Sequence, residues 1–151
     1  MPFPERLTAG DLVGRLVVGS AASWHVDDGS GERTLVHAWL LLEDGPAMFH
    51  TLSGVVIYRD PVYKPYLMEE LGARVVIEAS AGPEWEQLVG HRITSVRRLV
   101  DRRVDADAGW LVEANGRRLA VVDLGDELVA GKWPDEGRWA PVGIELSGGT
   151  Q

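Results

Sequence analysis

His37, Trp39 and His50 are the residues of this chain whose types and spacing best suit chemistry. Between them lies Asp44-Gly45, a dipeptide that favours a two-residue hairpin turn. With the turn centred there, His50 lies opposite Trp39, and His37 follows two positions along the same face, within about 8 Å. Imidazole titrates near neutral pH and serves as an acid, a base or a metal ligand. No carboxylate shares this hairpin face, so we predict no catalytic residue and no metal site, with His37 and His50 as the candidates if a reaction occurs.

Trp133 and Trp139 flank a polar, proline-bearing segment, and six tryptophans are many for 151 residues. We expect both indoles to be partly exposed beside Asp135 and Glu136, an arrangement typical of protein interfaces and ligand-pocket mouths. The sequence therefore predicts a binding surface at Trp133, Asp135, Glu136 and Trp139. The alternative is a loop that its rings pin to the domain. Trp39 is expected in the core and is kept as a further binding residue.

Two smaller charged groups lie in the second half of the chain. Asp123, Asp126 and Glu127 surround a glycine, and we interpret them as a solvated turn, although paired carboxylates can also do acid–base work. Arginines cluster from Arg92 to Arg118 inside an otherwise acidic sequence. They could bind an anion or an acidic partner, or join two copies of the chain as a homodimer.

No short motif in the sequence names a reaction. A Walker loop, G-x-G-x-x-G, H-E-x-x-H and G-x-S-x-G are all missing, and so is cysteine. Without cysteine the chain has no disulfides and no thiolate chemistry. We therefore expect no cofactor.

The formal net charge of −8 limits the classes of partner that this chain can bind. It opposes nucleic-acid binding, which needs cations to displace counterions from phosphates, and it suits a basic protein partner. No apolar run reaches the roughly 20 residues that cross a bilayer, so we expect no membrane contact and a cytoplasmic location. Basic residues other than Lys64 and Lys132 are all arginine, and this usage indicates a bacterial source.

The pattern of apolar residues and turn signals predicts a mainly β fold, with an α+β fold as second choice. Asn115-Gly116 gives the second half a hairpin signal like that of Asp44-Gly45. Short helices are expected over 66–71 and 83–88, a strand over 73–79, another over 142–146, and a flexible tail over 147–151. We expect one domain, 1–151, with eight to ten short strands closed into a small barrel or packed as two sheets.

Similar segments recur along the chain and predict an internal duplication, with copies at about 11–61 and 87–134. Leu12-Val13-Gly14 recurs as Leu88-Val89-Gly90, and Ala38-Trp39-Leu40 matches Gly109-Trp110-Leu111. A longer polar loop in the first copy, residues 27–32, explains the change of offset from 76 to 71 residues. Each copy reads as a β-meander, a run of consecutive antiparallel strands.

Together these features predict a non-enzymatic, acidic protein-binding module of immunity or regulatory type. Its partner would be another protein or a second copy of itself. The alternative is a small β-barrel that binds a hydrophobic small molecule, lined by tryptophans and by His37 or His50. Such a barrel could act as a cyclase- or isomerase-like enzyme by confining its substrate.

Overall fold

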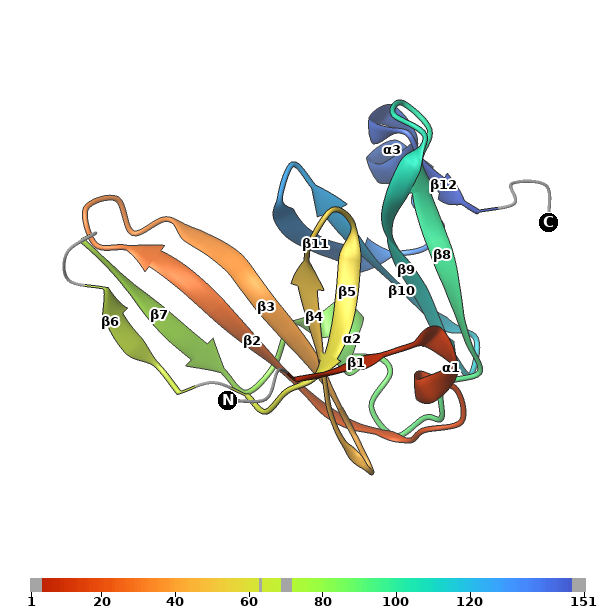
Figure 1. The fold of residues 1–151 in the computed structure, drawn as a ribbon, viewed down its shortest axis with the longest axis horizontal. Helices are drawn as coiled ribbons and strands as arrows, with labels where there is room; N and C mark the ends of the chain where they lie inside the picture. Colours follow the sequence, from red (N-terminus) through yellow and green to blue (C-terminus); the bar gives the residue numbers. More distant parts are fainter. Residues whose placement is uncertain (1–3, 63, 69–71, 148–151) are drawn as a thin grey trace.

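The computed structural model describes residues 4–62, 64–68 and 72–147, which form two antiparallel sheets joined by short helices (Figure 1). Of the described residues, about 56% are in strands and 11% are helical. The mainly β prediction is therefore confirmed, and the strands pack as two sheets. Within the described residues, every helix is too short or too polar to cross a bilayer.

The larger sheet has seven strands in the order β1-β5-β4-β3-β2-β7-β6. Its centre is the meander β2 to β5, with β1 at one edge and the β6–β7 hairpin at the other (Figure 1). The strands are β1 (Glu5–Leu7), β2 (Val17–Asp27), β3 (Arg33–Leu42), β4 (Gly45–Thr51), β5 (Val55–Arg59), β6 (Tyr66–Met68) and β7 (Ala73–Glu78).

The smaller sheet has five strands in the order β11-β10-β9-β8-β12, so a second meander, β8 to β11, is extended by β12. Its strands are β8 (Ser95–Asp101), β9 (Ala106–Ala114), β10 (Arg117–Leu124), β11 (Glu127–Lys132) and β12 (Ile144–Leu146). The helices are α1 (Ala9–Leu12), α2 (Pro83–Glu86), α3 (Glu136–Trp139) and the 3₁₀ turn η2 (Ala140–Val142). Together, α3 and η2 carry the chain from β11 to β12, which lie at opposite edges of this sheet.

Both predicted hairpins form, but only the second turns where the sequence places it. Asn115 and Gly116 have φ of 51° and 76°, as a type I′ turn requires. In the first hairpin Leu42 pairs with Gly45, so the turn residues are Glu43 and Asp44. The predicted centre at Asp44-Gly45 is therefore wrong by one residue.

The helix expected over 66–71 is also wrong within its described part. Tyr66–Met68 is strand β6, which pairs with β7 from Ala73 to Val75. Six residues give a helix too few hydrogen bonds to be stable alone, and here the sheet edge supplies pairing instead. Residues 69–71 and 148–151, the rest of that helix and most of the expected tail, lie outside the described residues. The helix expected near Pro83 is confirmed as α2.

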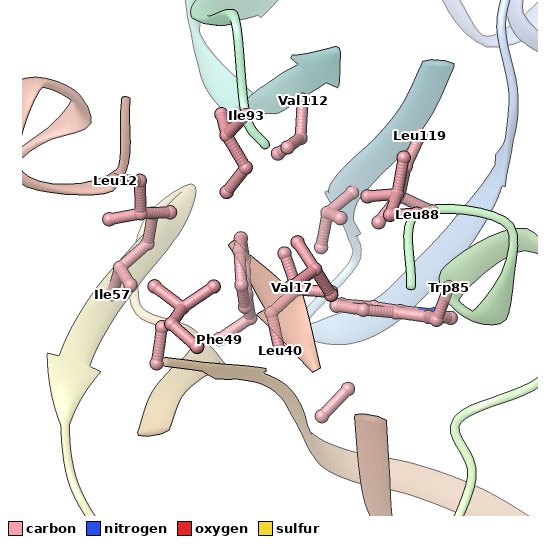
Figure 2. Packing of buried hydrophobic residues seen from close by; sticks show 14 of the residues in the cluster. Leu12, Val17, Leu40, Phe49, Ile57, Trp85, Leu88, Ile93, Val112 and Leu119 are labelled. Atoms are coloured by element: carbon pink, nitrogen blue, oxygen red, sulfur yellow. The ribbon is translucent and has the colours of Figure 1, made fainter. Parts of the chain in front are cut away.

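The main core lies between the two sheets and draws residues from both meanders (Figure 2). Leu40 and Phe49 come from the larger sheet, Val112 and Leu119 from the smaller one, and Trp85 from α2. The rings of Phe49 and Trp85 meet edge to face, with centroids 5.3 Å apart, a favourable aromatic geometry. Neither sheet can bury its inner face without the other.

A short antiparallel junction links the two Leu-Val-Gly segments, and its hydrogen bonds repeat in matched pairs. Gly14 N donates to Ile93 O at 2.7 Å, and Gly90 N donates to Val17 O at 2.8 Å. Val17 N donates to His91 O, and Ile93 N donates to the carbonyl of Arg15. Exchanging each residue of one segment for the residue 76 positions away in the other converts every one of these hydrogen bonds into its counterpart. The junction therefore has a local two-fold symmetry. We call these contacts the two-fold junction.

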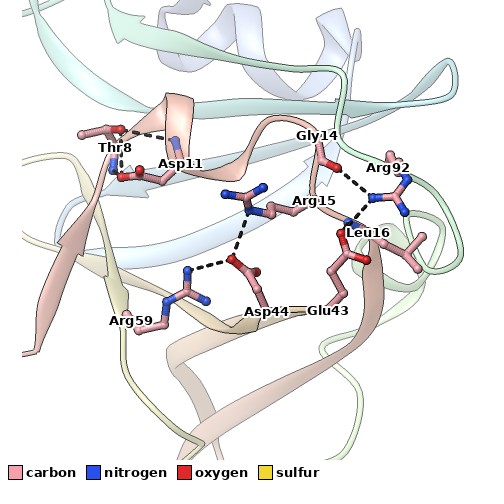
Figure 3. A network of polar contacts seen from close by, with 9 residues as sticks. All are labelled: Thr8, Asp11, Gly14, Arg15, Leu16, Glu43, Asp44, Arg59 and Arg92. Carbon is pink, nitrogen blue, oxygen red and sulfur yellow. Dashed lines mark hydrogen bonds and ion pairs between the residues drawn. The ribbon is translucent and has the colours of Figure 1, made fainter.

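Charged side chains surround the two-fold junction on its solvent side (Figure 3). Arg92 donates to Gly14 O at 3.0 Å and to the carboxylate of Glu43 at 2.8 Å. That bond from Arg92, helped by one from Leu16 N, holds the pKa of Glu43 below its usual range. Both partners are exposed, so this contact adds little to stability.

The structure aligns the two hairpins differently from the sequence match, by one residue. Leu42 and Ala114 each precede a two-residue turn. Counting back from them, the counterpart of Trp110 is Ala38, not Trp39. Ala38 and Trp110 both face the main core, whereas Trp39 packs on the opposite face of its sheet. The shared course of the meanders supports the duplication, which stays a prediction, but the matching tryptophans do not.

Candidate functional site

The segment that the sequence predicts as a binding surface borders a groove of about 410 Å³. One side is formed by Trp133 to Glu136, which follow β11 and begin α3, and the other by β12. We call it the α3–β12 groove. Its lining residues are Trp133, Pro134, Asp135, Glu136, Trp139, Ala140, Gly143, Ile144, Glu145 and Leu146.

The two tryptophans of this groove differ in exposure. Trp133 is half-buried, as expected, but Trp139 is only 1% exposed, so its predicted exposure is wrong. Its ring packs among Leu99, Leu111 and other core residues of the smaller sheet, and its Nε1 donates to Lys132 O at 2.9 Å. This is the alternative that the sequence left open, since the ring pins the segment to the domain. Trp139 thus supports the groove while Trp133 lies at its surface.

Negative charge dominates the α3–β12 groove. Asp135, Glu136 and Glu145 line it, and no lysine or arginine is among its described lining residues. Arg102 donates to the Glu145 carboxylate at 2.8 Å from outside the lining. Arg138, within α3, lies over the Trp139 ring at 4.9 Å from the centroid and borders a different hollow. The groove therefore presents three carboxylates beside an indole.

His37 and His50 border a second hollow, of about 430 Å³, on the face of the larger sheet that points away from the main core. We call it the histidine hollow. The shifted turn places His50 opposite His37, not opposite Trp39 as predicted. The two rings stack with centroids 4.8 Å apart, and His37 lies 6.0 Å from the Trp39 ring. The predicted patch nevertheless forms. Moving the turn by one residue changes each cross-strand partner by two residues, and a shift of two keeps every side chain on the same face of the sheet.

Trp39 itself is completely buried beneath this patch. Its Nε1 donates to Asp60 O at 2.9 Å, and its ring packs with Ala21 and Met48. Trp39 is therefore core, as expected, and a bound partner could reach it only through its neighbours. Its role as a binding residue stays a prediction.

A carboxylate that the hairpin pattern does not reveal also lies near the histidines. Asp60 follows β5 and borders the hollow together with Tyr58. Alternation along β5 could have indicated it, because Tyr58 lies opposite Met48 and Asp60 is two residues further on. Among the residues that the structure describes, however, no three histidine or acidic side chains gather closely enough to hold a metal ion.

His37 is poorly suited to act as a general base at neutral pH. Burial, followed by the charge of His50, lowers the pKa of His37 to about 4, although Asp60 opposes the shift. Ser23 Oγ lies 3.4 Å from His37 Nδ1 and can share a hydrogen bond with it. His50 Nδ1 is buried with no hydrogen-bond partner in the described chain. A general base works best with a pKa near the working pH, which His37 does not have.

The other charged groups noted in the sequence are used within the fold. The Asp123 carboxylate accepts from Gly54 N at 3.1 Å and from Asp126 N at 2.8 Å, which closes a turn against the other sheet. Arg97 and Arg118 both pair with Glu113. The arginine cluster is thus largely neutralised by its own sheet.

Comparison of this chain with protein-family models, with curated proteins and with solved structures finds no match. Its function is therefore inferred from the geometry of its own sites.

Proposed function

We propose that this chain is a non-enzymatic binding protein that holds a basic segment of a partner protein in the α3–β12 groove. The observation that carries the proposal is the lining of that groove by Asp135, Glu136 and Glu145, with no lysine or arginine among its described lining residues. Of the three acids, Glu145 pairs with Arg102, which lies outside the lining. Charge complementarity of this kind speeds association and excludes acidic partners. The net charge of −8 extends the same attraction over the whole molecule.

The apolar part of the contact would come from Trp133. Its half-buried indole lies beside the carboxylates, and tryptophan is among the residues that contribute most when an interface closes over them. Basic side chains also carry long apolar stems that can cover such a ring. We extend the proposal to a role in neutralising or regulating a basic partner in the bacterial cytoplasm, which the acidic groove and the lack of cysteine suit.

A nine-residue peptide of alternating lysine and valine tests the proposal. In NMR spectra of ¹⁵N-labelled protein, we expect it to shift the Trp133 indole and the amides of Asp135 and Glu136. Asp135→Asn combined with Glu136→Gln should weaken binding at least fivefold and reduce its salt dependence. The matched control, Glu5→Gln with Glu32→Gln, removes two exposed acids elsewhere and should bind within twofold of wild type.

Trp133→Ala is the informative tryptophan variant, because Trp139→Ala would empty part of the core. We expect Trp133→Ala to weaken binding of the peptide and to lower the melting temperature less than Trp139→Ala does, because its indole is only half-buried against the same core. Equal loss of affinity in the groove variant and the control variant, or shifts confined to another surface, would overturn the proposal.

The histidine hollow favours a second candidate function, the binding of a small hydrophobic ligand. Its lining combines Met48, Leu52 and Tyr58 with the two imidazoles, and its volume lies in the range of ligand sites. Because the hollow lies on an outer sheet face, this candidate is binding and not catalysis by confinement. Titration with 4-phenylimidazole should shift the ring protons of His37 and His50, and unchanged rings at millimolar ligand would exclude it.

A further inference from the structure

We propose that the partner segment binds as a sixth strand of the smaller sheet, paired along the free edge of β12. This inference rests on the proposed function and specifies how the α3–β12 groove recognises its partner. Its first support is the position of β12, which ends the strand order of its sheet and pairs with β8 alone. An edge strand exposes a row of backbone donors and acceptors that another chain can pair with.

The hydrogen bonds of β12 define which groups are exposed at that edge. Arg102 N donates to Gly143 O at 2.8 Å, and Ser147 N donates to Arg98 O at 2.9 Å. Antiparallel pairing alternates, so residues 143, 145 and 147 direct their backbone groups toward β8. The N–H and C=O groups of Ile144 and Leu146 then point away from β8. Within the described chain, no loop or second strand bonds to them.

The groove runs along this same edge. Ile144, Glu145 and Leu146 all line it, although consecutive side chains of a strand point to opposite faces of the sheet. Because the groove touches all three residues, we infer that it follows the strand's edge, with Trp133 to Glu136 on its far side. The added strand would lie in the groove, between β12 and that segment.

The two faces of β12 determine the side chains that the added strand should carry. Ile144 is buried and Leu146 half-buried, on the face that packs with Trp133 and Trp139. Glu145 is exposed on the other face and accepts a hydrogen bond from Arg102 at 2.8 Å, so a basic partner residue would share or replace that ion pair. Because side chains alternate in the partner strand as well, apolar residues should meet the first face and basic residues the second. The partner is therefore an extended segment of alternating apolar and basic residues.

A second copy of this chain fits the edge less well. Two β12 strands paired with each other would bring Glu145, Asp135 and Glu136 of one molecule against the same acids of the other. Like charges placed opposite each other across strands destabilise the pairing. A basic segment from a different protein meets the same carboxylates with attraction, so we choose it as the occupant and leave the homodimer as an outcome of the test.

The experiment compares three forms of the lysine–valine peptide on ¹⁵N-labelled protein: unmodified, and N-methylated on either alternate set of residues. N-methylation removes strand hydrogen bonds but keeps charge and side chains. We expect one methylated form to lose at least tenfold in affinity and the other to stay within about threefold, because a strand pairs through alternate residues. The amides of Ile144 and Leu146 should become protected from hydrogen exchange when the unmodified peptide binds.

A pair of protein variants tests the edge from the other side. Leu146→Pro removes an outward N–H and should weaken peptide binding at least tenfold, since proline is tolerated on the solvent side of an edge strand. Leu146→Ala removes the side chain alone and should weaken binding less than threefold. The melting temperatures of both variants show whether the sheet itself has changed.

The outcomes separate this inference from the proposed function. Equal binding by both methylated peptides, with weaker binding to the Asp135→Asn/Glu136→Gln protein, overturns the added strand and keeps the acidic groove. No binding to the groove by any peptide overturns both. Self-association that protects Ile144 and Leu146 without peptide would assign this edge to a homodimer and overturn the choice of occupant.

Discussion

At the scale of single residues, the two candidate sites are distinguished by what surrounds their charged groups. Asp135 and Glu136 lie in a groove with no cation among its described lining residues, so they are available to a basic partner. His37 instead lies against His50 in a largely apolar hollow. There burial favours the neutral imidazole, and the hollow suits apolar contact better than proton transfer.

The low pKa of His37 predicts how stability depends on pH. Because its pKa is about 4 in the folded protein and near 6.5 in the unfolded chain, the unfolded chain binds a proton first as the pH falls. Stability is therefore full above pH 6.5 and declines toward pH 4. We expect His37→Gln to remove roughly 1 kcal/mol of that decline, a value reduced for the partial access of water.

Urea unfolding between pH 4 and pH 8 measures this effect, and His25→Gln, which changes a histidine outside the hollow, is its control. The prediction fails if wild type and His37→Gln lose stability in parallel over this range.

At the scale of elements, hairpin register explains most of what the sequence could and could not show. The sequence predicts the Asn115-Gly116 turn correctly, because both turn positions need positive φ and asparagine and glycine adopt it readily. It does not predict the first turn, because Glu43-Asp44 has no such signature. One residue of slip reverses a strand's faces, and this is why Trp39 and Trp110 looked equivalent when Ala38 is the true counterpart.

The groove could be predicted only in part for a related reason. The aromatic and acidic residues from Trp133 to Trp139 are visible in the sequence, and they were identified there. The role of Ile144 to Leu146 depends on the order of strands in the sheet, which brings distant segments together and leaves no local pattern. Short helix α3 was missed because four residues carry too little periodicity.

Close contact between strands makes Gly109 a sensitive position. A Cβ added there would lie 1.9 Å from the carbonyl oxygen of Val121 on β10, so the paired strands must move apart. We expect Gly109→Ala to destabilise the protein by more than about 2 kcal/mol. Gly10→Ala is the matched control, because its Cβ meets nothing closer than 3.8 Å and alanine favours its helix.

Thermal unfolding of both variants, followed by circular dichroism, checks this prediction. Gly10→Ala should melt at or above the wild-type temperature. If Gly109→Ala melts at the same temperature as Gly10→Ala, the close approach of β9 to β10 does not constrain this position.

At the scale of the whole molecule, one core serves both sheets (Figure 2). Phe49 and Leu40 of the larger sheet are covered by Trp85 and Leu119 from the other half of the chain. We therefore expect the two meanders to unfold as a single cooperative unit, because neither half has a complete apolar interior. The single domain expected from the chain's length stays a prediction.

Dividing the chain in the loop before α2 tests whether the two meanders depend on their shared core to fold. We expect fragments 1–79 and 80–151 each to be unfolded alone, since each would expose half of the main core to water. Mixed at equal concentration, they should regain the near-ultraviolet circular dichroism of the intact protein, which reports fixed tryptophan packing. A fragment that gives a dispersed NMR spectrum alone would contradict a shared core.

The two-fold junction between the Leu-Val-Gly segments has a consequence for the origin of the fold. A contact that is unchanged when its two sides are exchanged can form between two identical chains as readily as within one. If the two meanders descend from one gene, their ancestor met a second copy of itself through this contact before gene fusion joined them. After fusion the halves no longer had to remain identical, so one could acquire a histidine hollow and the other an acidic groove.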